Sequence, residues 1–242
     1  MEKKTIVVVG AGKGLGNHVA ERFGREGFRV VLMARNMESL TTYQKELEAE
    51  GIETYVIGAD AANPETLTEA HRWVKGKFGA PDVLYYNVGI TAADEPDKMD
   101  GETLMSHYKV DVASAYHCAK LICDDEFAAK NGTMFFTGGG LADYPITGFL
   151  PLSMDKAALR AMAQALHAEL KPRGIFVGTI TVFGSIGIDS FMSPARIADR
   201  VWQLYQERDV CEVKYEYPEV QGSNLNAADY WTKVYSLAEK YK

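Results

Sequence analysis

Short apolar stretches alternate with longer segments of mixed polarity over most of the chain. A run of roughly four to eight apolar residues is typical of a buried strand. Apolar positions three and four residues apart are typical of a helix that covers a core. The predicted strands lie at residues 5–9, 29–34, 53–57, 83–86, 133–137 and 175–182, and the predicted helices at 15–25, 37–49, 64–78, 101–129 and 152–170.

This alternation predicts the fold class. Parallel strands joined by right-handed helical crossovers place helices on both faces of one sheet. We therefore expect an α/β protein with a single doubly wound, Rossmann-type domain over residues 1–242 and a mainly parallel sheet.

The last quarter of the chain, residues 185–242, departs from the strand–helix alternation. Ser193 followed by Pro194 is typical of an N-cap and the first position of a helix. No linker, repeat or low-complexity tract sets this part apart, so we assign it to the same domain. Its predicted elements are a helix from Pro194 to about Gln206, an edge strand over Val213, Tyr215 and Tyr217, and a helix from about Ala227 to Lys240.

Composition narrows the class of protein. A chain of 242 residues with 47% hydrophobic content can bury a substantial core. The net charge of -7 argues against nucleic acid or an anionic membrane as a partner. The chain has no apolar run long enough to span a membrane, and the segment 1–4 leads directly into a strand, so we expect a cytoplasmic protein. Cys118, Cys123 and Cys211 lack metal-ligand spacing, so we expect no metal site.

A cluster of glycines follows the first predicted strand and precedes the first predicted helix. Glycines let the backbone approach an anion closely, and a helix N-terminus offers unpaired N–H groups and the positive end of a dipole. In α/β proteins this arrangement holds the pyrophosphate of a dinucleotide, although it is also found in a plain tight turn. The predicted pyrophosphate-binding residues are Gly10, Gly12, Gly14, Leu15 and Gly16.

Two positive charges indicate which dinucleotide is bound. Proteins that bind NAD carry an acidic residue at the end of the second strand, but this chain has Arg35 there. A carboxylate repels a ribose 2′-phosphate, whereas a guanidinium forms two hydrogen bonds with it. Lys13 adds a second cation within the glycine turn. The predicted cofactor is therefore NADP(H).

Polar residues after the third and fourth strands extend the predicted cofactor site. Asp60 would ordinarily cap the next helix, but Asn63 before Pro64 suits that role better. Asp60 is then available to accept a hydrogen bond from the adenine amino group. Asn87 and Gly89 follow the fourth strand, where a flat ligand would lie over the sheet, and the alternative is an ordinary turn.

The order and spacing of these residues are similar to those of the short-chain dehydrogenase/reductase family from about residue 5 to residue 184. In that family a hydride moves between a nicotinamide and an alcohol or carbonyl carbon. A tyrosine is the acid/base, and a lysine four residues later holds the nicotinamide ribose. A serine about a dozen residues earlier binds the substrate oxygen, and an asparagine on the preceding helix supports a water relay. The residues that carry the resemblance are Gly10, Gly14, Gly16, Arg35, Asp60, Asn87, Gly89 and Lys156.

The resemblance is weaker in the catalytic half of the pattern. Lys156 matches the family lysine, and Gly184 matches the glycine after the sixth strand. Leu152 stands at the tyrosine position, Gly139 at the serine position and Asp111 at the asparagine position. The resemblance therefore implies that cofactor binding is retained and that the usual proton donor is replaced.

Two hypotheses about function follow. The first is an NADP(H)-dependent oxidoreductase with an unidentified carbonyl or alcohol substrate, in which Lys156, Tyr144 and Asp111 are the candidate catalytic residues. Tyr144 is the preferred replacement donor, Ser153 or a water held by Lys156 is the alternative, and the amides of 138–140 are a candidate oxyanion site. The second is a non-catalytic NADP(H)-binding sensor or scaffold. The fold does not decide between them, and loss of dinucleotide binding would exclude both.

The resemblance also implies partners. In the family, the two helices corresponding to 101–129 and 152–170 pair between subunits, so we expect a homodimer or homotetramer, unless both helices only cover the sheet. The segment 185–192 stands at the position of the family's substrate lid. Its apolar residues indicate a partly apolar pocket for a small-molecule substrate. Those residues are Ile186, Ile188, Phe191 and Met192.

Overall fold

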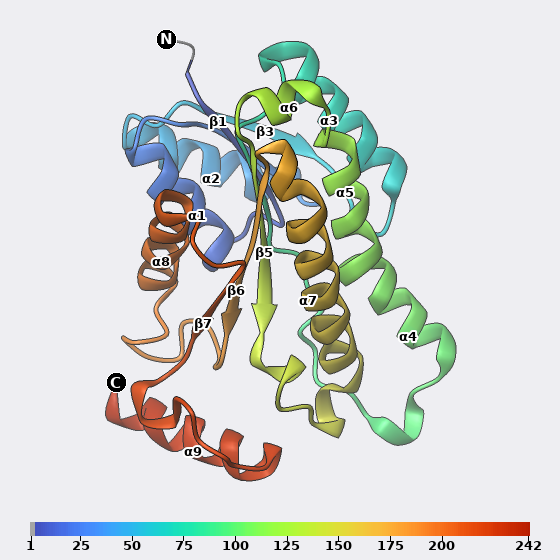
Figure 1. The fold of residues 1–242 in the computed structure, drawn as a ribbon, viewed down its shortest axis with the longest axis vertical. Helices are drawn as coiled ribbons and strands as arrows, with labels where there is room; N and C mark the ends of the chain where they lie inside the picture. The colour runs from blue at the N-terminus through green and yellow to red at the C-terminus, as the bar shows by residue number, and fades with distance from the viewer. Residues whose placement is uncertain (1–2) are drawn as a thin grey trace.

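The computed structural model describes residues 3–242, which form an α/β domain around a seven-stranded sheet (Figure 1). The strand order is β3-β2-β1-β4-β5-β6-β7, and each neighbouring pair is parallel. Because β1 lies between β2 and β4, the direction of winding reverses there, and such a reversal leaves a crevice at the carboxyl ends of the strands. The strands are β1 (Thr5–Val9), β2 (Arg29–Ala34), β3 (Thr54–Gly58), β4 (Val83–Tyr86), β5 (Thr133–Gly139), β6 (Phe176–Val182) and β7 (Glu212–Tyr215).

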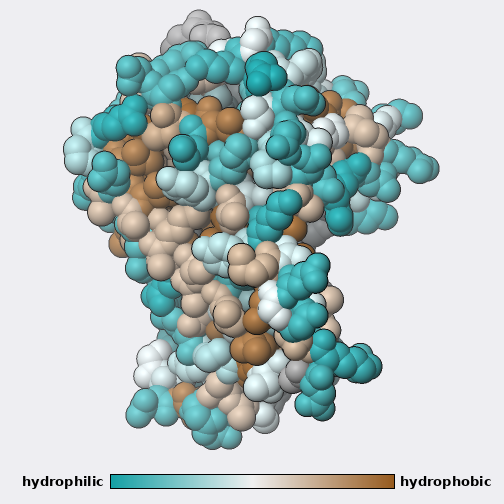
Figure 2. Space-filling model, turned by 90° about the vertical axis from the view of Figure 1, so that its right-hand side faces the viewer, coloured by the Kyte–Doolittle hydropathy of each residue, from teal (hydrophilic) through white to brown (hydrophobic). Residues whose placement is uncertain are grey.

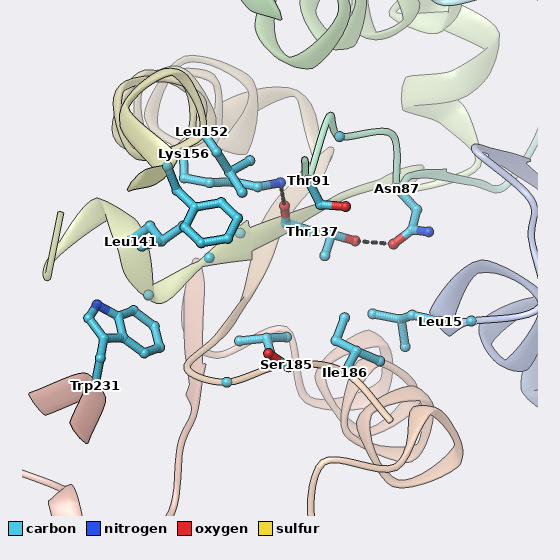
Figure 3. A pocket seen from close by; sticks show the side chains of 18 of the residues that line it. Leu15, Asn87, Thr91, Thr137, Leu141, Leu152, Lys156, Ser185, Ile186 and Trp231 are labelled. Carbon is cyan, nitrogen blue, oxygen red and sulfur yellow. Dashed lines mark hydrogen bonds between the residues drawn. The ribbon is translucent and has the colours of Figure 1, made fainter. Parts of the chain in front are cut away.

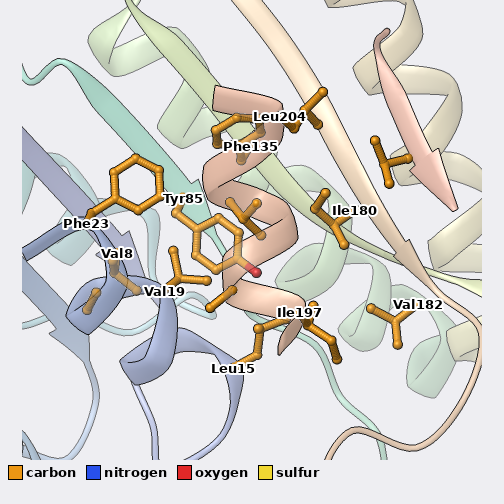
Figure 4. Close-up of a cluster of buried hydrophobic side chains, with 14 of the residues drawn as sticks. Val8, Leu15, Val19, Phe23, Tyr85, Phe135, Ile180, Val182, Ile197 and Leu204 are labelled. Atoms are coloured by element: carbon orange, nitrogen blue, oxygen red, sulfur yellow. The ribbon is translucent and has the colours of Figure 1, made fainter. Parts of the chain in front are cut away.

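Helices cover both faces of the sheet (Figure 1). One face carries α1 (Leu15–Arg25), α2 (Met37–Ala49) and α8 (Pro194–Glu207). The opposite face carries α3 (Pro64–Phe78), α5 (Ser114–Ile122), α6 (Asp125–Ala129) and α7 (Leu150–Leu170). The first strand shows why both cores form. Its side chains alternate between faces, so that Ile6 and Val8 join one core and Val7 and Val9 the other. Figure 4 shows the first of these cores, in which Val8 packs near Val19 and Phe23 of α1.

The predicted fold class is confirmed, and most helix boundaries agree with the structure. The predicted continuous helix over 101–129 is wrong. The chain there forms α4 (Gly101–Tyr108), a π-helical turn (Lys109–Ala113), α5 and, after a break, α6. The break has a local cause, because the side chain of Asp124 accepts a hydrogen bond from Phe127 N and caps a new helix.

The C-terminal elements lie at the carboxyl ends of the strands. As predicted, β7 is an edge strand, but it ends at Tyr215, and the predicted Tyr217 lies beyond it, before a 3-10 turn. The helix α9 (Ala227–Lys240) has the predicted bounds. Figure 1 shows α9 at the end of the molecule to which β5 and β6 point. Ser193 is at the N-cap position of α8, but its side chain makes no capping hydrogen bond, contrary to the prediction. No helix within residues 3–242 is long and apolar enough to cross a membrane.

Candidate functional site

The glycine turn after β1 contains glycines of two kinds. Gly10 has a φ of +88°, and a Cβ atom there would lie 2.8 Å from Val88 N. A Cβ atom at Gly16 would lie 2.6 Å from the carbonyl oxygen of Gly10. The fold itself therefore requires these two glycines. Cβ atoms at Gly12 and Gly14 would meet nothing within 4 Å, so these two leave open space at the start of α1.

Two cavities lie along the carboxyl edge of the sheet and share Asn87 and Gly89 as lining residues. The smaller, of about 290 Å³, is lined by Gly10, Arg35 and Asp60 among others. The larger, of about 510 Å³, extends past the start of α1 toward α7 and α9. Figure 3 shows Leu15 and Asn87 at one end of it and Trp231 at the other. Of the predicted cofactor residues, the larger cavity is lined by Gly14, Leu15, Asn87, Gly89, Lys156 and Gly184.

The two predicted phosphate-binding cations are exposed. Arg35 follows β2 and lines the smaller cavity, whereas Lys13 lines neither cavity. Neither forms an ion pair with another residue of the part that the structure describes. The neighbouring Asn36 caps α2 by accepting a hydrogen bond from Ser39 N. The helix cap is thus supplied by Asn36, and Arg35 is available for an anionic ligand.

Asp60 lines the smaller cavity, where the adenine is predicted to bind. As predicted, Asn63 is the N-cap of α3 and accepts a hydrogen bond from Glu65 N at 3.2 Å. Asp60 already makes one hydrogen bond within the protein, since its Oδ1 accepts from Ala62 N at 2.9 Å. Its contact with the adenine amino group stays a prediction.

Asn87 links the ends of three neighbouring strands. Its Nδ2 donates to Gly10 O at 3.2 Å, and its Oδ1 accepts from Thr137 Oγ1 at 2.8 Å (Figure 3). No sequence motif marks Thr137 as a site residue, although it interrupts the apolar stretch just before the triple glycine. The polar side chain on β5 thus fixes the orientation of Asn87.

Lys156 lies on α7 with 8% of its surface exposed, and its Nζ donates a hydrogen bond to Thr137 O at 2.8 Å. Burial lowers the pKa of Lys156, and the carboxylates of Asp111 and Asp155 oppose that shift. Leu152 lies one helical turn earlier and also lines the larger cavity (Figure 3). Lys156 is the one charged side chain among the described residues that line this cavity.

Asp111 belongs to the π-helical turn and is 1% exposed. Both of its carboxylate oxygens accept hydrogen bonds from Ile90 N, at 3.0 and 3.1 Å. Burial raises its pKa, while Lys156 opposes the rise. Asp111 lines neither cavity. Its carboxylate lies behind the cavity wall, where its hydrogen bonds from Ile90 N hold the loop that follows β4.

Asp155 is a buried acid that the sequence analysis did not single out. It is 2% exposed, and its Oδ2 finds no hydrogen-bond partner within residues 3–242. Burial, followed by the charge of Asp111, raises its pKa to about 7. Asp111, Asp155 and Lys156 thus form a buried cluster of two carboxyl groups and one amine.

The structure gives the predicted replacement donors other roles. The ring of Tyr144 stacks on Tyr230 with centroids 3.7 Å apart, and Tyr144 lines neither cavity. Its carbonyl oxygen accepts a hydrogen bond from Trp231 Nε1 at 2.7 Å. Ser153 is 3% exposed and donates its hydroxyl hydrogen to Phe149 O within its own helix segment. Neither geometry supports proton donation into the cavity.

The predicted lid contributes less to the cavity than expected. Ser185 and Ile186 line it, but Met192 is fully buried in the core, and a Cβ atom at Gly184 would lie 2.9 Å from Met192 Cε. The far end is formed instead by residues of the segment between β5 and α7 and by residues of α9, none of which is predicted from the sequence. They are Leu141, Ile146, Phe149, Trp231 and Tyr235. Residues 138–140 also line the cavity, and their role as an oxyanion site stays a prediction.

The described residues contain no group of three or more His, Cys, Asp or Glu side chains that could hold a metal ion. Fold, glycine turn and buried lysine together are those of a dinucleotide-binding domain. The sequence matches the short chain dehydrogenase family over residues 4–193, and the chain therefore belongs to that family.

Two relatives and one solved structure illustrate the similarity. Short chain aldehyde dehydrogenase 1 of Euphorbia lathyris is 25% identical over 188 residues, covering 77% of this chain and 65% of that protein. The NADPH-dependent 1-acyldihydroxyacetone phosphate reductase of Saccharomyces cerevisiae is 27% identical over 179 residues, covering 72% of this chain and 59% of that protein. The match thus spans less than two thirds of either relative. An alcohol dehydrogenase of the archaeon Thermococcus sibiricus, solved with 5-hydroxy-NADP, superposes with a TM-score of 0.78 at 22% identity, covering 90% of this chain and 99% of that one.

Proposed function

We propose that the chain is an NADP(H)-dependent oxidoreductase that interconverts a small carbonyl compound and an alcohol. The observation that carries the proposal is the placement of cations along the crevice: Arg35 lines the smaller cavity and Lys156 the larger. Family membership supports it, as do the relatives, which are named as a dehydrogenase and an NADPH-dependent reductase.

The residues of the crevice fit a phosphorylated dinucleotide. Gly12 and Gly14 leave space for a pyrophosphate beside the N-terminus of α1, whose N-cap, Gly14, has no side chain to occupy the free N–H groups. The guanidinium of Arg35, together with Lys13, would hold the 2′-phosphate. The ammonium group of Lys156 would hold the nicotinamide ribose, and the bound nicotinamide would supply or accept a hydride.

In this proposal Leu152 and Gly139 stand where the family carries its tyrosine and serine. Leucine has no proton to donate, and a positioned acid typically accelerates such a step by a factor of about 10²–10⁴. The non-catalytic NADP(H) sensor or scaffold is the competing hypothesis. The relatives named above do not favour it, because each is named for a reaction.

The test is a titration followed by a substrate screen. The protein is titrated with NADPH, NADP⁺ and NADH by nicotinamide fluorescence or calorimetry, and is then incubated with NADPH and a panel of aldehydes, ketones and quinones. Sustained, enzyme-dependent loss of nicotinamide absorbance supports the proposal. Tight binding without turnover on the whole panel would favour the sensor, and no binding at millimolar cofactor would exclude both.

We also propose that two copies of the chain pair through α4, α5 and α7. Met105 is 66% and Met154 51% exposed, and Tyr108 and Tyr116 are 41% and 46% exposed. Figure 2 views the side on which α4 and α5 lie, where apolar surface gathers between hydrophilic areas. Burial of such side chains in a symmetric interface removes apolar area from water. Light scattering of the wild type should therefore give the mass of a dimer or tetramer. The double variant Met105→Lys, Met154→Lys should give the mass of a monomer. A monomeric wild type at micromolar concentration would contradict this proposal.

A further inference from the structure

The proposed reaction needs a proton donor, and the larger cavity offers few. Leu152 is apolar, and Tyr144 and Ser153 lie outside the lining. Thr91, Thr137, Ser185 and Tyr235 contribute hydroxyl groups, but an alcohol with an ordinary pKa is a weak acid at neutral pH, and the hydroxyl of Thr137 already donates to Asn87. Lys156 is the cationic acid of this cavity, and an ammonium has three N–H bonds, of which one is directed to Thr137 O.

The two buried carboxyl groups lie close behind Lys156. A Cβ atom built on Gly89 would lie 3.5 Å from Lys156 Nζ and 3.7 Å from Asp111 Oδ2, so both groups face the same point of the cavity wall. Asp155 is adjacent to Lys156 on α7, which packs against the π-helical turn that carries Asp111. Two further titratable groups are coupled to this cluster. They are His107 of α4, whose charge acts on Asp111, and Tyr86 of β4, whose pKa is raised by burial and, to a smaller extent, by the charges of Cys118 and Asp111.

Keeping all three groups of this cluster ionised costs free energy because they are buried. Two ionised carboxylates and one ammonium leave a net negative charge in a site where each side chain is at most 8% exposed. The Oδ2 atom of Asp155 has no donor within the described part of the chain, and a buried carboxylate oxygen without a donor is strongly disfavoured. A single proton bound to one of the two carboxyl groups removes the excess negative charge and leaves only one ionised carboxylate beside the ammonium.

We propose that Lys156 is the proton donor of the reduction and that the Asp111–Asp155 carboxyl pair holds the proton that restores it. This inference rests on the proposed function. A bound reduced nicotinamide would supply the hydride for the new C–H bond at the carbonyl carbon, and the electron pair of the C=O π bond would move to oxygen. One N–H bond of Lys156 breaks as the O–H bond of the alcohol forms. The neutral amine takes a proton from the carboxyl pair, which regains it from water, and oxidation runs these steps in reverse.

In this arrangement Lys156 is the catalytic residue, and Asp111 and Asp155 act through it. Burial lowers the pKa of the ammonium toward the working pH, which makes it a better acid than a solvated lysine. The carboxylates oppose that shift and keep the group protonated. Removing either carboxylate should therefore make Lys156 lose its proton at a lower pH.

The first test uses the protein without cofactor. Carboxyl resonances of aspartate, labelled with ¹³C, are followed by NMR against pH in the wild type, in Asp111→Asn and in the exposed control Asp125→Asn. We expect one buried aspartate to titrate near pH 7 in the wild type and in the control, and to titrate at least about one unit lower in Asp111→Asn. Titration of every aspartate below about pH 5 in the wild type would show that the carboxyl pair holds no proton near neutral pH and would overturn the proposed source of protons.

The second test separates proton donation from binding. Lys156→Arg keeps the positive charge but cannot release a proton near neutral pH. We expect NADPH affinity within about fivefold of wild type and kcat lower by a factor of about 10²–10⁴. Lys156→Met should lose both. In Asp155→Asn the alkaline limb of kcat should move to lower pH with KM little changed. An unchanged kcat in Lys156→Arg would overturn the inference and leave the proposed function intact. A wild type without turnover would overturn the proposed function and, with it, the role of Lys156 as proton donor.

Discussion

The side chain of Lys156 occupies the space beside Gly139, because a Cβ atom at Gly139 would lie 3.1 Å from Lys156 Cγ. The triple glycine thus brings the backbone of β5 against the stem of the lysine, and Nζ reaches Thr137 O from there. A side chain at position 139 and the present position of Lys156 are therefore in steric competition.

Gly139→Ala should displace the Lys156 stem by a few tenths of an ångström. We expect NADPH affinity to fall by about tenfold, equivalent to about 1.4 kcal/mol, because the ammonium no longer meets the ribose at its best distance. The measurement is a fluorescence titration with NADPH. Gly148→Ala is the control, since a Cβ atom there meets nothing within 4 Å, and equal affinity in both variants would contradict the steric argument.

Alanine at two glycines of the β1–α1 turn should change two different properties, the stability of the fold in one case and cofactor binding in the other. Gly16→Ala brings Cβ within 2.6 Å of Gly10 O, so the free energy of unfolding should fall by about 1–3 kcal/mol in urea denaturation. Gly14→Ala meets no protein atom, so it should leave unfolding within about 0.5 kcal/mol of wild type. Its added methyl group should instead weaken NADPH binding. Full cofactor affinity in Gly14→Ala would mean that the open space holds no ligand.

Arg35→Gln should change the preference between the two nicotinamide dinucleotides. Loss of charge-assisted hydrogen bonds to a 2′-phosphate costs about 1.5–3 kcal/mol, so NADPH affinity should fall roughly ten- to hundredfold. NADH, which lacks this phosphate, should bind equally well to both proteins. Parallel titrations decide the matter, and an equal loss for both cofactors would place Arg35 elsewhere than at the 2′-phosphate.

Asp155→Asn should stabilise the protein at alkaline pH. The carboxyl pKa is about 7 in the folded protein and about 3.9 in an unfolded chain, so between these values the folded state binds the extra proton. The contribution of Asp155 to stability is therefore complete below about pH 4 and is lost as the pH rises to about 7. At pH 8 we expect the variant to be more stable than wild type by roughly 1–4 kcal/mol, with a smaller difference at pH 5. Urea denaturation at both pH values tests this, and a difference that does not depend on pH would contradict it.

Tyr144→Phe should leave turnover unchanged within about twofold, since the ring stack on Tyr230 needs no hydroxyl. The hydrogen bond from Trp231 goes to the backbone of Tyr144 and is also retained. Steady-state kinetics with any active carbonyl compound check this. A loss of kcat of a hundredfold or more would restore the hydroxyl of Tyr144 as the proton donor.

The alternation of apolar runs was sufficient to predict the fold class, because parallel strands buried on both faces leave a clear sequence pattern. The continuous helix over 101–129 was wrong because hydrophobic spacing does not register a π-helical turn or a new N-cap at Asp124. Gly10, Gly14, Arg35 and Lys156 could be placed at the crevice because each follows a strand or lies on a helix that borders it, and their roles toward a cofactor stay predictions.

Other parts of the site depend on contacts that no local pattern reveals. Asp155 is adjacent to Lys156 in sequence, but its burial depends on the π-helical turn that carries Asp111. Trp231 and Tyr235 line the cavity because α9 returns across the ends of the strands. Tyr144 lies close to the predicted site in sequence, yet its ring stacks on Tyr230 and contacts Phe183 edge to face.

The hydrogen bonds of Asn87 to Gly10 and Thr137 are formed entirely between groups of the protein itself. Three neighbouring strands are thereby fixed in relation to one another when the chain folds, and the conformational entropy of that part of the site is lost at folding rather than at binding. A dinucleotide that binds to this preorganised surface loses mainly its own torsional freedom. The binding free energy that its phosphates and rings provide is therefore not offset by a cost of ordering this part of the protein.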